Sequence, residues 1–125
     1  MNAFRPNTLL PARFAGWTLA IATAVLSIVP PYLRPETDVP HDIEHFLIYV
    51  ATGLAFGIGY ERKRIPVALL LLIFTAAAEI AQLFVPGRHA RVSDFIVDAI
   101  AMCAGLIVAS LTDRILSRFD LKLDV

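Results

Sequence analysis

Three carboxylic acids lie inside stretches of sequence that are otherwise apolar enough to span a membrane: Glu79, Asp94 and Asp98. A charged side chain at the centre of a bilayer costs roughly 2.5–3.5 kcal/mol on insertion scales. Acids in such positions usually face other polar groups, a ligand or a proton pathway. Because carboxyl and imidazole groups can transfer protons, we regard Glu79, Asp94 and His45 as hypothetical catalytic residues.

Helical spacing predicts that further polar side chains share faces with these acids. Residues three or four apart lie on one side of a helix. The pairs with this spacing are His45 with Tyr49, Glu79 with Gln82, and Asp94 with Asp98. Each pair should face the interior of a helix bundle, because lipid cannot satisfy polar groups. The short turn at Pro86-Gly87 should hold its flanking helices antiparallel, so we expect the pairs to converge on one site.

Four apolar segments can carry these residues across a bilayer, which requires about 20 residues per helix. They run over about residues 14–29, 43–60, 65–85 and 92–111. The first segment is similar to a signal peptide, but it ends in Pro30-Pro31 without a clear cleavage site. We therefore expect it to be retained as a helix. The predicted fold is an all-α, four-helix transmembrane bundle that forms a single domain over residues 1–125.

The composition agrees with a membrane protein. Of the 125 residues, 58% are hydrophobic and 18% charged, whereas soluble domains are about 45–50% apolar. Eleven basic and eleven acidic residues cancel, so no net charge attracts nucleic acid. The glycine-rich phosphate loops and serine nucleophile motifs of soluble enzymes are absent. We expect no cofactor, and the single Cys103 cannot form an intrachain disulfide.

The basic residues predict the orientation of the bundle. Lysine and arginine are enriched in cytoplasmic loops. Eight of the eleven basic residues lie on one side of the predicted spans: Arg5, Arg13, Arg62, Lys63, Arg64, Arg114, Arg118 and Lys122. Only Arg34, Arg88 and Arg91 lie on the other side. We therefore predict that both termini face the cytoplasm and that the polar pairs occupy the outer half of the membrane.

Small residues indicate where helices approach closely. Gly53 and Gly57 form a Gly-x-x-x-Gly motif, and Ala101, Gly105 and Ala109 form a second small-residue ridge. Such ridges let helix backbones pack together in lipid. Packing within the chain is the favoured interpretation, and a homo-oligomer interface is the alternative.

Five short motifs follow one another in a fixed order between residues 41 and 105. They are His45-Phe46-x-x-Tyr49, Glu79-x-x-Gln82, Pro86-Gly87-Arg88, Asp94-x-x-x-Asp98 and Gly105. The ordered set resembles the VanZ-like family of small membrane proteins, whose founding member is associated with teicoplanin resistance. The resemblance implies a multi-pass protein of the bacterial inner membrane with a role in the cell envelope. The chain departs from the family pattern at His41-Asp42, where Asp-Lys is common, at Asp98, where Asn is usual, and at Ala101, where Gly is usual.

Three functions are compatible with these residues. The first is an outward-facing site that binds, or acts on, the anionic headgroup of a membrane lipid or lipid-linked cell-wall precursor, or the glycopeptide itself. In that site Arg88 and Arg91 would hold phosphate, with ligand contacts from the residues Tyr49, Gln82 and Asp98. The second is a proton or metal-ion site of a transport-related protein, although no acids continue the path through the inner half. The third is a non-catalytic structural partner of another membrane protein.

Overall fold

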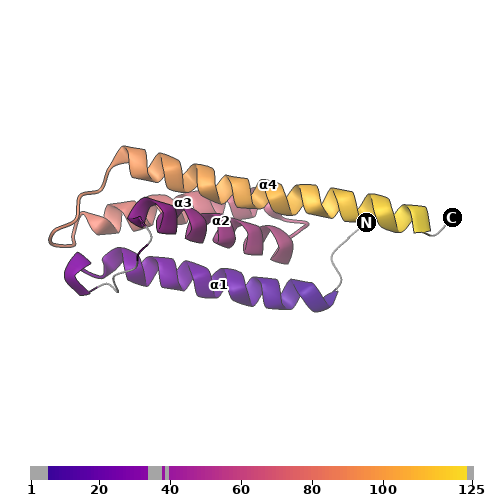
Figure 1. Ribbon diagram of the computed structural model, residues 1–125, viewed down its shortest axis with the longest axis horizontal. Coiled ribbons are helices and arrows are strands. Elements are labelled where there is room, and N and C mark those ends of the chain that lie inside the picture. The colour runs from indigo at the N-terminus through magenta and orange to yellow at the C-terminus, as the bar shows by residue number, and fades with distance from the viewer. Residues whose placement is uncertain (1–5, 34–37, 39, 124–125) are drawn as a thin grey trace.

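The computed structural model describes residues 6–33, 38 and 40–123. The described residues form four α-helices and one short 3-10 helix, and they contain no strand. The elements are α1 (Pro6–Ile28), η1 (Pro31–Leu33), α2 (His41–Gly59), α3 (Arg64–Gln82) and α4 (Val92–Leu123) (Figure 1). The predicted all-α, four-helix fold is therefore confirmed.

Within the described part of the chain, three helices are long and apolar enough to cross a membrane. These spans are Asn7–Ile28, Arg64–Gln82 and Val92–Phe119. The fourth helix, α2, is not among them, because its first turn carries Asp42 and Glu44 and these acids lower its mean hydropathy. Large apolar side chains are exposed on all the spans. An apolar outside around a partly polar inside suits a protein that lipid surrounds.

The four helices alternate in direction, which gives the bundle two distinct ends (Figure 1). At one end α1 and α3 finish while α2 and α4 begin; we call it the Pro86 end, after the loop between α3 and α4. At the opposite end α2 turns into α3; we call it the Arg64 end. The helices α2 and α4 therefore run parallel to each other, and α4 continues past the other helices at the Arg64 end (Figure 1).

The most extensive contact in the bundle joins α2 to α4. A Cβ atom added to Gly53 would collide with the backbone carbonyl of Met102, and one added to Gly105 would collide with that of Val50. A Cβ atom on Gly57 would lie 2.6 Å from the Cβ atom of Ala109. The two small-residue ridges thus interlock inside the chain, as the favoured interpretation predicted. The short loop does bring α3 against α4, but α2 is the principal neighbour of α4.

The helix boundaries differ from the predicted ones at three places. The first helix begins at Pro6 rather than near residue 14, because proline is well tolerated in a first turn. The last helix reaches Leu123 rather than 111, because no glycine or proline lies between residues 111 and 123 to end it. The third ends at Gln82, and the chain then turns through Gly87, whose φ of +80° is a conformation that favours glycine.

The middle of the bundle is apolar or internally satisfied. Phe56, Leu71 and Met102 belong to the buried core. The buried hydroxyl groups of Thr52 and Thr75 donate hydrogen bonds to the carbonyl oxygens one turn earlier, at 2.6 Å and 2.9 Å. These hydroxyl groups are bonded within their own helices. The apolar core therefore separates the polar groups at one end of the bundle from those at the other.

Candidate functional site

Four side chains from three helices gather in the interior of the Pro86 end: His45, Tyr49, Glu79 and Asp98. We call them the polar cluster. The His45 Nδ1 atom lies 3.7 Å from Asp98 Oδ2, which joins α2 to α4. The Asp98 side chain is only 3% exposed, whereas that of His45 is 22% exposed. The histidine therefore stands between the buried acid and the surroundings of the bundle.

The other two members complete the cluster from α3 and from deeper along α2. Glu79 lies within electrostatic reach of His45 and Asp98, and also of Asp94. Tyr49 lies close enough to Asp98 and Glu79 to interact with both of their charges. Both Tyr49 and Glu79 are buried. Of the six residues in the predicted pairs, these four thus come together, Asp94 interacts with Glu79 from an exposed position, and Gln82 makes no contact with the cluster that the structure records.

Three atoms of this cluster have no hydrogen-bond partner in the part of the chain that the structure describes. Among the described residues, none lies in full hydrogen-bond geometry with the Tyr49 hydroxyl, Glu79 Oε2 or Asp98 Oδ2, although the Tyr49 side chain interacts with the Asp98 carboxyl group. The separation of His45 and Asp98 is also longer than a hydrogen bond. An unsatisfied buried polar group costs about 1–3 kcal/mol, and more if it is charged. Native proteins satisfy such groups with ordered water, an ion or a ligand.

The edge of the cluster is formed by residues on either side of the α3–α4 loop. Asp94 is exposed and accepts a hydrogen bond from Ser93 Oγ at 3.0 Å. The backbone of Arg91 lies close enough to the Glu79 carboxyl group to interact with it, while the Arg91 side chain is exposed. Gln82 is buried near the end of α3. Asp94 and Arg91 therefore lie at the edge of the cluster, next to Glu79.

Arg88 lies apart from the acids and contacts α1 instead. Its Nη2 atom donates a hydrogen bond to the backbone carbonyl of Leu26 at 3.0 Å. This contact fastens the α3–α4 loop to the last turn of α1. It uses one of the five N–H donors of a guanidinium group, so the remaining donors can still bind an anion at the edge of the bundle.

Ser27 is a buried polar residue that the sequence interpretation did not include. It is only 1% exposed, and its Oγ atom has no hydrogen-bond partner among the described residues. Thr23, one turn earlier, is also buried, but its hydroxyl donates to the Leu19 carbonyl at 2.8 Å. The spacing of Thr23 and Ser27 on an otherwise apolar helix was the signal that could have identified this face.

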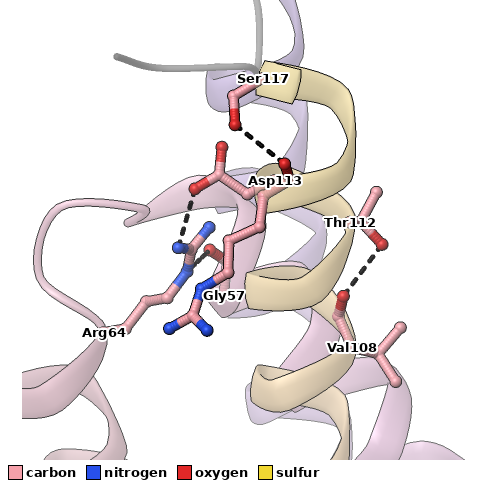
Figure 2. Close-up of polar contacts among 7 residues, drawn as sticks. Gly57, Arg64, Val108, Thr112, Asp113 and Ser117 are labelled. Carbon is pink, nitrogen blue, oxygen red and sulfur yellow. Dashed lines mark hydrogen bonds and ion pairs between the residues drawn. The ribbon is translucent and has the colours of Figure 1, made fainter. Parts of the chain in front are cut away.

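The Arg64 end holds a second polar contact that the sequence interpretation missed. Arg64 Nη1 donates to Asp113 Oδ2 at 2.9 Å, and Arg64 Nε donates to the Gly57 carbonyl at 3.0 Å. Figure 2 shows the guanidinium between these two acceptors. The contact links α2, α3 and α4. It joins two side chains and one backbone carbonyl, and we regard it as structural.

The chemistry of the polar cluster follows from its atoms. Carboxylate oxygens accept hydrogen bonds, and an imidazole can accept or donate one. Glu79 and His45 can also exchange protons with a bound molecule. Within the described part of the chain, no three His, Cys, Asp or Glu side chains are arranged to hold a metal ion. The arrangement therefore suits a ligand that offers hydrogen-bond donors.

Comparison with known proteins gives one family match. The sequence model of the VanZ/LLP1 family matches residues 7–113. The matched range includes the polar cluster, Ser27 and both loop arginines. No curated protein and no solved structure matches the chain.

Proposed function

This chain belongs to the VanZ/LLP1 family, and from that premise we propose that its polar cluster serves an outward-facing site for a phosphate-bearing headgroup. The headgroup would belong to a lipid or lipid-linked cell-wall precursor in the outer leaflet of the bacterial inner membrane. Membrane-spanning helices and family membership support this assignment. Contribution to glycopeptide resistance is the corresponding cellular proposal.

The observation that carries the proposal is the set of buried, unsatisfied polar atoms at the Pro86 end. The Tyr49 hydroxyl, Glu79 Oε2 and Asp98 Oδ2 lack hydrogen-bond partners among the described residues. Leaving several such groups unsatisfied in one place is unfavourable. A headgroup whose hydroxyl or amine groups donate to them would remove that cost.

The two loop arginines supply the anion-binding part of the site. The side chain of Arg91 is exposed, and the backbone of the same residue lies close to Glu79. Arg88 is fixed by its bond to Leu26 at the same end. Guanidinium groups bind phosphate through paired hydrogen bonds. Phosphate would therefore sit at the edge, with the rest of the headgroup directed toward the acids.

A catalytic version of the same proposal assigns proton transfer to Glu79, Asp94 and His45. Glu79 and His45 interact within the cluster, and Asp94 interacts with Glu79 from the exposed edge. This arrangement gives a proton a route from the surroundings to a buried carboxylate. Binding without reaction requires the same residues, so the first experiment measures binding.

The test uses purified full-length protein in detergent with a short-chain polyprenyl diphosphate. We expect the double substitution Arg88→Ala/Arg91→Ala to weaken binding by about tenfold or more, because charge-assisted hydrogen bonds contribute about 1.5–3 kcal/mol each. The matched control is Lys63→Ala/Arg118→Ala, which removes two exposed bases remote from the Pro86 end. Equal affinity of the Arg88→Ala/Arg91→Ala variant and the unsubstituted protein would refute the proposal.

The cellular role is tested separately by teicoplanin susceptibility in a responsive host. We expect Glu79→Gln and Arg88→Ala each to abolish any protection that the unsubstituted protein gives. Protein levels must be compared, because loss of the protein would mimic loss of the site. Unchanged protection by both variants at normal abundance would exclude a role of this site in resistance.

A further inference from the structure

Ser27 on α1 stands level with the polar cluster. The register of α1 against α2 is set by two contacts: Gly59 packs on Arg13, and Gly16 packs on Phe56. In an antiparallel pair, each residue added on α1 moves the contact back by one residue on α2. Extending this register from Gly16 places Ser27 beside His45. Because Ser27 is buried, its side chain lies inside the bundle at this level.

Each of the four helices contributes one buried polar atom at the Pro86 end that has no hydrogen-bond partner within the described part of the chain. These atoms are Ser27 Oγ, the Tyr49 hydroxyl, Glu79 Oε2 and Asp98 Oδ2, and each residue is more than nine-tenths buried. Two are carboxylate oxygens and two are hydroxyl groups that can accept hydrogen bonds. The group that would satisfy them must offer several N–H or O–H donors from one small centre.

The charge of the polar cluster further limits which chemical group can bind there. The cluster holds the two acids Glu79 and Asp98, and His45 is its only basic member. Buried charges are stable when they are paired with opposite charge and hydrogen-bonded. A protonated primary amine brings one positive charge and three N–H donors. A hydroxyl group brings no charge, and a trimethylated amine brings charge without any N–H donor.

We propose that the polar cluster, closed on the α1 side by Ser27, is a subsite for a protonated primary amine. This inference rests on the proposed phosphate-bearing headgroup and specifies its chemical class. A headgroup with phosphate at Arg88 and Arg91 and an amine a few bonds away would occupy both parts of the site. The amine would enter past the half-buried His45 and the exposed Asp94.

The test compares short-chain phospholipids that differ only in the headgroup, with binding measured by calorimetry on full-length protein in detergent. We expect the aminoethyl phosphate headgroup to bind about tenfold or more tightly than the phosphoglycerol headgroup, because it adds charged hydrogen bonds. The trimethylated headgroup should bind like phosphoglycerol. Soluble aminoethyl phosphate, tested in parallel, distinguishes recognition of the headgroup alone from recognition that requires the lipid.

Two variants and one control separate this inference from the proposed function. Ser27→Ala and Asp98→Asn should each remove the preference for the primary amine over phosphoglycerol, so that the two headgroups bind these variants with equal affinity. Thr23→Ala, a buried neighbour whose hydroxyl is already satisfied, should keep the preference. Arg88→Ala/Arg91→Ala should weaken the binding of both headgroups by the same factor. Unchanged affinity in this double variant would contradict the proposed phosphate site but not the amine subsite.

The amine subsite is overturned if the unsubstituted protein binds all three lipid headgroups equally. That result would mean that water satisfies the four atoms. It is also overturned if Ser27→Ala and Asp98→Asn retain the full preference of the unsubstituted protein, since the amine would then be recognised elsewhere.

Discussion

Among single residues, Asp98 lies in surroundings that disfavour its charge. It is an acid on an apolar helix, it is buried, and one of its oxygens lacks a hydrogen-bond partner among the described residues. Its neighbour Glu79 is also an acid, so their charges repel when both are ionised. Residues that reduce stability in this way are common at binding sites, because function requires them.

We therefore expect Asp98→Asn to stabilise the free protein. Asparagine keeps the shape of the side chain, removes the charge and adds donors that can bond to Glu79. The free energy of unfolding should rise by about 1 kcal/mol, the scale of relieving one unsatisfied buried group. Thermal unfolding in detergent measures the change. Asp113→Asn is the control, because it removes the charge from an ion pair with Arg64 that is 2.9 Å long and should lower the melting temperature. A lower melting temperature for Asp98→Asn would contradict this account.

Sequence spacing predicted the members of the polar cluster but not all of their partners. Repeats of three and four residues identified His45, Glu79 and Asp98, because lipid forces polar faces inward. The contact of Arg88 with Leu26 was not predictable, because it depends on where the last turn of α1 meets the loop. Ser27 was overlooked because one serine in an apolar helix is usually satisfied by its own backbone.

At the level of elements, the parallel pair α2 and α4 sets the geometry of the site. The pair brings His45 and Asp98 together, and its glycines allow that approach. The helices themselves followed from apolar runs of sufficient length. Their pairing did not, because a short loop shows which helices are consecutive but not which small-residue ridges interlock.

Gly53→Ala should disrupt this pair far more than Gly16→Ala disrupts the contact of α1 with α2. The added methyl group at Gly53 meets backbone atoms of Met102, which cannot move without displacing α4. At Gly16 it meets only the ring of Phe56, at 3.0 Å, and a side chain can shift. We expect Gly53→Ala to cost about 3 kcal/mol or more, beyond ordinary overpacking, and Gly16→Ala about 1 kcal/mol. Thermal unfolding of the two variants tests the order, and equal melting temperatures would contradict it.

For the whole molecule, the orientation in the membrane decides which compartment the polar cluster serves. The distribution of basic residues predicts that the Pro86 end is outside. A single cysteine placed at either end can test this after Cys103→Ala removes the only native thiol. In intact cells a membrane-impermeant maleimide should label His89→Cys, in the α3–α4 loop, but not Ser117→Cys, near the end of α4. Permeabilised cells provide the control, in which both cysteines should react. The opposite pattern in intact cells would show that the predicted orientation is wrong and would exclude a ligand from the outer leaflet.

The length of α4 connects the two ends of the molecule mechanically. This helix begins beside Asp94 and Asp98, is gripped near its middle at Gly105, and extends past the other helices to Leu123. The helix can therefore tilt as a rigid rod around its contact at Gly105. A tilt of about 5° around Gly105 would displace the far end by roughly 2 Å, given a rise of about 1.5 Å per residue. If a ligand in the proposed site draws Asp98 toward Glu79, the C-terminal part of α4 would move at the opposite end of the bundle.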